Sequence, residues 1–165
     1  MSAGQVVRRA TTGDGPAIGQ LLFDFNREFD EPTPVPGVLA ERISSLIGGD
    51  EVDGDAGVAD RTVVLLAGDA PPIGVAVLRF RPAIWSAGLE CYLAELYVVP
   101  ERRGQGAGRA LLEHAVRLAR EHGADTMDIG VDESDTVARR LYERLGFSNR
   151  SNADGDLMYV YERAL

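Results

Sequence analysis

Residues 100–109 join an apolar strand candidate to an amphipathic helix through a turn that is rich in glycine and arginine, Pro-Glu-Arg-Arg-Gly-Gln-Gly-Ala-Gly-Arg. Glycines let the backbone approach an anion without a Cβ in the way. The helix that follows turns its positive dipole end towards the same point. The passage from strand through turn and helix to the next strand therefore predicts a β-α-β unit with a phosphate site at the turn.

The size of the chain predicts a single globular domain over residues 1–165, because 165 residues with 45% hydrophobic side chains suffice for one core. No apolar run approaches the about 18 to 20 residues that span a bilayer, and the N-terminus lacks a basic stretch followed by a hydrophobic core. We therefore expect a cytoplasmic protein with no membrane partner.

The charged residues exclude several kinds of chemistry. All 17 basic residues are arginine, so no lysine can bind phosphate or form a Schiff base. The net charge of −9 disfavours nucleic acid as a partner. An acidic surface suits a cationic substrate, although it also serves solubility.

The hydrophobic periodicity predicts an α/β fold with strands in a mixed sheet and helices on its faces. Strands are expected at residues 5–9, 62–67, 73–80, 89–99 and 125–131, and helices at 18–29, 38–46, 108–122 and 134–145. A last strand or hairpin is expected from 147–148 and 157–162. The stretch 48–60, rich in glycine and acidic residues, predicts a mobile loop.

Two kinds of phosphate ligand suit the turn differently. A dinucleotide site wants the spacing G-x-G-x-x-G, whereas the glycines here are spaced G-x-G-x-G, although Asp132 could imitate the acid that binds a ribose. The arginines Arg102, Arg103 and Arg109 favour a ligand with more phosphate charge, such as coenzyme A.

Two motifs together resemble the GCN5-related N-acetyltransferase (GNAT) family. The segment 96–112 is similar to its cofactor motif, R/Q-x-x-G-x-G/A, at Arg103, Gly106 and Gly108. About thirty residues later, segment 138–147 is similar to its A-x-x-L-Y-E-x-x-G-F helix. The resemblance implies an acyl-CoA N-acyltransferase fold with a mostly antiparallel central sheet, and an enzyme that uses acetyl-CoA as cosubstrate.

The same resemblance implies which residues would hold the cofactor. The pyrophosphate would lie on the amides of residues 103–109, and the pantetheine arm along the strand that ends near Val98. The implied cofactor-binding residues are Leu96, Tyr97, Val98, Arg103, Gly104, Gln105, Gly106, Ala107, Gly108 and Arg109. One position departs from the family pattern: seven residues before Tyr142, where many relatives have a cofactor-contacting asparagine, stands Asp135, which could cap the helix instead.

Acetyl transfer from a thioester to an amine needs a base for the ammonium, a donor for the oxyanion and an acid for the thiolate. Glu95 lies in an apolar strand, where an acid needs a partner or a purpose, and burial would raise its pKa towards that of a general base. The alternatives are that Glu95 faces solvent, caps a bulge, or only orients the acceptor. The resemblance implies Tyr142 as general acid and the amide of Val98 as oxyanion donor; ordinary helix packing is the alternative for Tyr142.

The other candidate residues have simpler explanations. His114 flanks the apolar stripe of its helix and His122 caps that helix, so no metal site is expected. Cys91, the only cysteine, has no histidine nearby in sequence and is expected to be a packed thiol. Trp85 and Tyr92 could line an acceptor pocket or serve as ordinary packing.

The acceptor is the least defined part of the prediction. Asp24, Glu28, Asp30 and Glu31 would border the acceptor in relatives, and they suit a small cationic amine of aminoglycoside or polyamine type. Solvated surface charge explains them as well. The alternatives are a protein or peptide N-acetyltransferase, an enzyme with a longer acyl group, and a non-catalytic CoA-binding regulatory domain. The oligomeric state is open, and a homodimer is compatible with the resemblance.

Overall fold

The computed structural model describes residues 5–48 and 61–165, in two compact units, Met1–Ile129 and Gly130–Leu165. Each unit is treated by itself. Residues 49–60, nearly all of the expected mobile loop, lie outside the described part, and Gly48 ends a helix.

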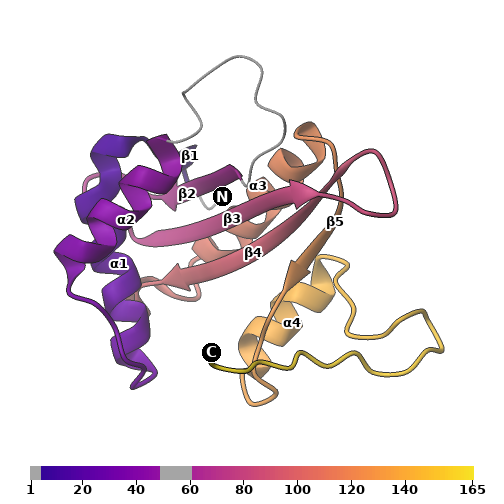
Figure 1. Cartoon of the computed structure of the whole chain (residues 1–165). Helices are drawn as coiled ribbons and strands as arrows, with labels where there is room; N and C mark the ends of the chain where they lie inside the picture. Colours follow the sequence, from indigo (N-terminus) through magenta and orange to yellow (C-terminus); the bar gives the residue numbers. More distant parts are fainter. Residues whose placement is uncertain (1–4, 49–60) are drawn as a thin grey trace. The chain divides into compact units, whose positions relative to one another are not determined.

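The first unit contains a five-stranded sheet in the order β1-β2-β3-β4-β5 (Figure 1). The pairings β1–β2, β2–β3 and β3–β4 are antiparallel, and β5 is parallel to β4. The strands are β1 (Val7–Arg9), β2 (Arg61–Ala67), β3 (Gly74–Pro82), β4 (Leu89–Val98) and β5 (Ala124–Ile129). The mixed, mostly antiparallel sheet of the prediction is confirmed, with strand ends within three residues of those expected.

Two helices, α1 (Gly15–Glu28) and α2 (Pro36–Gly48), cover one face of this sheet. Their apolar side chains share a core with alternate residues of β2, β3 and β4: Ile18, Leu21, Ile43, Ile47, Val64, Leu66, Val75, Val77 and Tyr97. The two helices approach closely at Gly19, where a Cβ would lie 2.5 Å from the carbonyl oxygen of Pro36. Only glycine permits that separation.

The helix after the glycine turn, α3 (Ala107–Glu121), packs on the opposite face. Its buried stripe is Leu111, Leu112, Ala115, Leu118 and Ala119, as its 3.6-residue periodicity predicts. His122 ends the helix, and the left-handed Gly123 (φ +79°) follows it. Both assignments from the sequence are confirmed.

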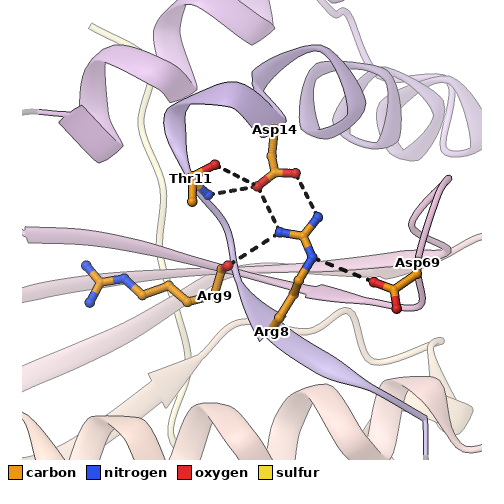
Figure 2. A network of polar contacts seen from close by, with 5 residues as sticks. All are labelled: Arg8, Arg9, Thr11, Asp14 and Asp69. Carbon is orange, nitrogen blue, oxygen red and sulfur yellow. Dashed lines mark hydrogen bonds and ion pairs between the residues drawn. The ribbon is translucent and has the colours of Figure 1, made fainter.

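A polar network fixes the chain between β1 and α1 (Figure 2). The Asp14 carboxylate accepts two hydrogen bonds from the Arg8 guanidinium, at 2.7 and 2.9 Å, and one from the Thr11 amide at 2.8 Å. Asp69, in the β2–β3 turn, lies 3.8 Å from Arg8. The hydrogen bonds from Arg8 and Thr11 hold the pKa of Asp14 well below its usual range.

Asp14→Asn is therefore expected to lower the free energy of unfolding by about 1 to 2 kcal/mol at pH 7. The contribution of a carboxyl with a lowered folded-state pKa is complete above its unfolded pKa, about 3.9, and is lost as the pH falls further. Chemical denaturation from pH 7 to pH 2 should show the two proteins converging below about pH 4. Asp69→Asn is the control and should cost less, because its contact with Arg8 is long and exposed; an equal cost would contradict the assignment.

The second unit contains one helix, α4 (Thr136–Arg144). The expected last strand is wrong: beyond α4 the described residues form only an isolated antiparallel bridge between Arg150 and Leu157. Turn-forming residues separate the two segments, and a hairpin without a third strand is rarely stable. Tyr159, Val160 and Tyr161 are accordingly exposed. In the described parts of both units, no helix is long and apolar enough to cross a membrane.

Candidate active site

Glu95 lies at an irregularity of β4. Leu78 of β3 pairs with Leu93 of β4. The preceding β3 residue, Val77, pairs with Glu95, so Ala94 is an extra residue in β4. Such bulges re-aim side chains and are common beside active sites. Because Glu95 is opposite Val77, it shares the sheet face that α1 and α2 cover.

The Glu95 carboxyl is half-buried, and burial raises its pKa. Among residues 5–48 and 61–165 it has no hydrogen-bond or ion-pair partner. Among the alternatives to a general base, exposure to solvent does not fit this burial. The bulge does lie beside Glu95, but the carboxylate does not bond to it. A desolvated, unpartnered carboxylate is poised to accept a proton.

Among the residues that the structure describes, the end of β4 has a free edge with no strand paired on the β5 side. Pairing with β5 stops at Leu93 and Ile129, five residues before β4 ends at Val98. The Val99 amide donates to the Ile73 carbonyl next to β3, at 2.9 Å. Because successive amides of a strand point to opposite sides, the amides of Val98 and Leu96 face away from β3. Tyr97 turns its backbone towards β3 instead, opposite Val75.

The glycine turn follows this free edge through a short 3₁₀ helix, η3 (Pro100–Arg102). Gly104 and Gly106 have φ of +73° and +89°, and a Cβ at either position would meet nothing within 4 Å. Both glycines are thus required by conformation and leave open space. The Ala110 amide is the first of α3 to bond back, to the Gly106 carbonyl at 2.9 Å. The amides of the first turn have no intrahelical partner, as at the start of any α-helix.

The side chain of Arg103 is anchored away from the turn. Its terminal nitrogens bind the Glu28 carboxylate, at the end of α1, at 2.7 and 2.6 Å, and its Nε donates to the Val98 carbonyl at 2.8 Å. The guanidinium also lies 5.6 Å from the centre of the Tyr97 ring. The Phe25 ring of α1 stacks on the same Tyr97 ring. Arg103 therefore links the end of α1 to the start of the turn, and it lowers the pKa of Glu28.

A double-mutant cycle tests this link. Arg103→Gln, Glu28→Gln and the double variant should give a coupling free energy of unfolding of about 0.5 to 1 kcal/mol, because the pair is bidentate but partly exposed. The control pair, Arg109 and Glu113, is one turn apart on α3 and more exposed, so its coupling should be about 0.3 kcal/mol. Equal couplings for the two pairs would contradict the link.

Tyr142 lies on α4 in the second unit, where it is 8% exposed and its ring packs near Phe147. Burial, with a smaller effect from the charge of Asp135, raises its pKa to about 12. Asp135 is the N-cap of α4 and accepts a hydrogen bond from the Ala138 amide at 3.0 Å. The helix-capping interpretation of Asp135 is thus confirmed.

Cys91 is fully buried, and burial raises the pKa of its thiol to about 12. It is a packed thiol, as expected. Trp85 is 95% exposed in the β3–β4 connection. The Nδ1 of His122 lies 2.9 Å from the Leu118 carbonyl of its own helix.

No local pattern in the sequence indicates the partner of Arg103. Glu28 was one of four candidate acids, with nothing to distinguish it. Arg79 lies on β3 on the same face as Val75 and Val77, so it is a cation in an otherwise apolar strand.

The comparison with known proteins identifies the class. Residues 23–147 match the model of the Acetyltransferase (GNAT) family, most of the chain, and the chain therefore belongs to this family. One solved structure is that of a protein from Arthrobacter sp. FB24 that is assigned as an acetyltransferase. Its sequence is 44% identical to this chain, and the two structures superpose with a TM-score of 0.83 over 100% of this chain and 99% of that one.

Two curated relatives have lower sequence identity than this structure. Streptothricin acetyltransferase of Streptomyces lavendulae is 33% identical over 61% of this chain and 52% of its own length. The uncharacterized N-acetyltransferase YhfO of Bacillus subtilis is 29% identical over 86% and 88% of the two chains. The chain matches 22% of the length of a mycothiol acetyltransferase from Thermobispora bispora and 52% of the length of the streptothricin acetyltransferase, so it spans about half or less of these relatives.

Proposed function

We propose that this protein is an acetyl-CoA-dependent N-acetyltransferase that moves the acetyl group directly to a primary amine. Glu95 carries the proposal, because a half-buried carboxylate without a partner, beside a strand bulge, is costly unless it has chemical work to do. A CoA-binding domain without catalysis would have no need of it.

The residues present fit the cosubstrate. The first-turn amides of α3 and the open space over Gly104 and Gly106 suit a pyrophosphate, since a Cβ at either glycine would occupy that space. The free edge of β4 at Leu96 and Val98 suits the amide groups of the pantetheine arm. Arg103 would contribute by holding the start of the turn. When bound, acetyl-CoA supplies an activated acetyl thioester.

Each protein group then has one role. Glu95 removes the proton from the ammonium of the acceptor, directly or through water, so that the amine becomes a nucleophile. The Val98 amide, which faces away from β3, donates a hydrogen bond to the developing oxyanion. Tyr142 remains a phenol at neutral pH because its pKa is raised to about 12, and it gives its proton to the leaving sulfur.

For the acceptor we propose a small cationic molecule with a primary amine. Two relatives support a small molecule by name, streptothricin acetyltransferase and the thialysine N-epsilon-acetyltransferase of Bos taurus, 30% identical over 54% of this chain. Of the four candidate acids, Glu28 is held by Arg103 and Asp24 accepts a hydrogen bond from Gln20. The cytoplasmic location and the homodimer stay predictions from the sequence.

A screen for thiol release from acetyl-CoA tests the proposal, with polyamines, aminoglycosides, amino acids and basic peptides as acceptors. We expect turnover with at least one small amine. CoA affinity is measured separately by calorimetry. Binding of CoA without turnover of any amine would instead establish the non-catalytic domain.

A further inference from the structure

The sheet face that carries Glu95 changes from apolar to polar over three successive rows of paired residues. The register of β2, β3 and β4 defines these rows. The first is Leu66, Val75 and Tyr97, the second Val64, Val77 and Glu95, and the third Thr62, Arg79 and Tyr92. The core under α1 and α2 includes the first row and the apolar members of the second. Glu95 thus stands at the boundary, with the polar row directly beside it.

The third row contains polar atoms that lack partners. The Thr62 side chain is 1% exposed, and within the described residues its Oγ1 has no hydrogen-bond partner. The buried Nε of Arg79 also has none there. The next arginine on the same strand and face, Arg81, binds Glu90 at 2.7 Å. Folded proteins pair nearly all such buried atoms, so the unpaired Nε of Arg79 beside the unpaired Thr62 hydroxyl indicates a ligand.

The chemistry of this row selects an anion. A guanidinium recognises a carboxylate through charge-assisted hydrogen bonds, and a neighbouring hydroxyl can donate another. Arg79 is one row from Val77, the partner of Glu95. Residues two apart on a strand are separated by about 7 Å, so neighbouring rows lie about that far apart. A single small molecule can reach both rows.

We propose that Arg79 and Thr62 form a carboxylate subsite for the acceptor, which is therefore an amino acid or a similar molecule that carries a carboxylate besides its reactive primary amine. This inference rests on the proposed acetyltransferase function. The acceptor's ammonium lies at Glu95 and its carboxylate at Arg79. An acceptor with amines alone would leave the Arg79 cation unpaired and facing a like charge.

Matched acceptors that differ only in the carboxylate test the subsite. The pairs are lysine with cadaverine and ornithine with putrescine, each assayed for thiol release with the full chain and acetyl-CoA. In at least one pair, kcat/KM should favour the amino acid by about 10- to 100-fold, the worth of hydrogen bonds to a charged group. Arg79→Gln should remove that preference, mainly by raising KM for the amino acid.

Three further variants separate recognition from folding. Arg79→Lys keeps the positive charge but loses the planar guanidinium that can donate two parallel hydrogen bonds to a carboxylate. It should retain part of the preference for the amino acid over the diamine. Thr62→Val has the shape of threonine without the hydroxyl and should lower the preference severalfold even if Arg79→Gln folds poorly. Arg81→Gln, on the same strand and face, is the matched control and should keep the preference.

Two results would overturn the subsite while acetyl transfer stands: diamines acetylated as well as their amino acids, or a preference unchanged in both Arg79→Gln and Thr62→Val. The absence of thiol release with every primary amine, polyamines and aminoglycosides included, would overturn the proposed function itself.

Discussion

Glu95→Gln should lower kcat by about 10²- to 10⁴-fold, the contribution of a positioned general base. The amide has nearly the shape of the carboxylate but cannot take a proton from the ammonium. CoA affinity should not change, because the glycine turn that would bind the phosphates begins beyond the end of β4. Steady-state assays of thiol release, with calorimetry for CoA, measure the two quantities.

Glu95→Gln should also make the protein more stable at neutral pH. A carboxyl whose pKa is raised by burial opposes folding when ionised. That penalty is complete above the raised pKa and absent below the unfolded value of about 4.3. Thermal unfolding should therefore show a higher Tm for the variant at pH 8 and equal values near pH 4. A structural role would give the opposite sign.

Glu90→Gln is the matched control, because Glu90 lies on the same strand but already binds Arg81. Its kcat should equal that of the wild type. A Glu95→Gln variant with full kcat would remove Glu95 from the mechanism. In the wild type, the rising limb of kcat/KM against pH should lie above the ordinary carboxyl range, in the direction of the raised pKa.

The elements with strong local patterns were predictable from the sequence. Helix α3 combines a 3.6-residue apolar stripe with a glycine turn before it and Gly123 after it, and its ends were correct within one residue. The last strand was not, because residues 157–162 have strand-forming side chains but a strand also needs a partner. Pairing partners are distant in the chain, and no local pattern reports them.

The site shows the same division. The half-buried position of Glu95 was predictable, because a single acid interrupts an apolar run. The bulge at Ala94 was not, since it arises from the register between β3 and β4 and no glycine or proline marks it. The carboxylate that holds Arg103 is 75 residues away in the chain. Properties of single residues could be predicted from the sequence, and properties of pairs required the fold.

Tyr142→Phe should lower kcat by about 10²-fold or more, because the variant lacks the phenolic proton that would go to the leaving sulfur. The ring keeps its packing beside Phe147, and in the described part of the chain the hydroxyl has no hydrogen-bond partner to lose. The free energy of unfolding and the affinity for CoA should therefore change little. This pattern, a loss in kcat alone, distinguishes a proton donor from a packing residue.

The control for Tyr142 is Tyr161→Phe, in the same unit at a side chain that is 91% exposed, and its kcat should not change. The pH dependence gives a second check. Because the pKa of Tyr142 is raised to about 12, the phenol stays protonated throughout the usual assay range. Ionisation of Tyr142 should therefore cause no fall in wild-type kcat below about pH 10, the ordinary tyrosine pKa. A descending limb near neutral pH that disappears in Tyr142→Phe would contradict the raised pKa, and an unchanged kcat in that variant would leave the leaving group to be protonated by water.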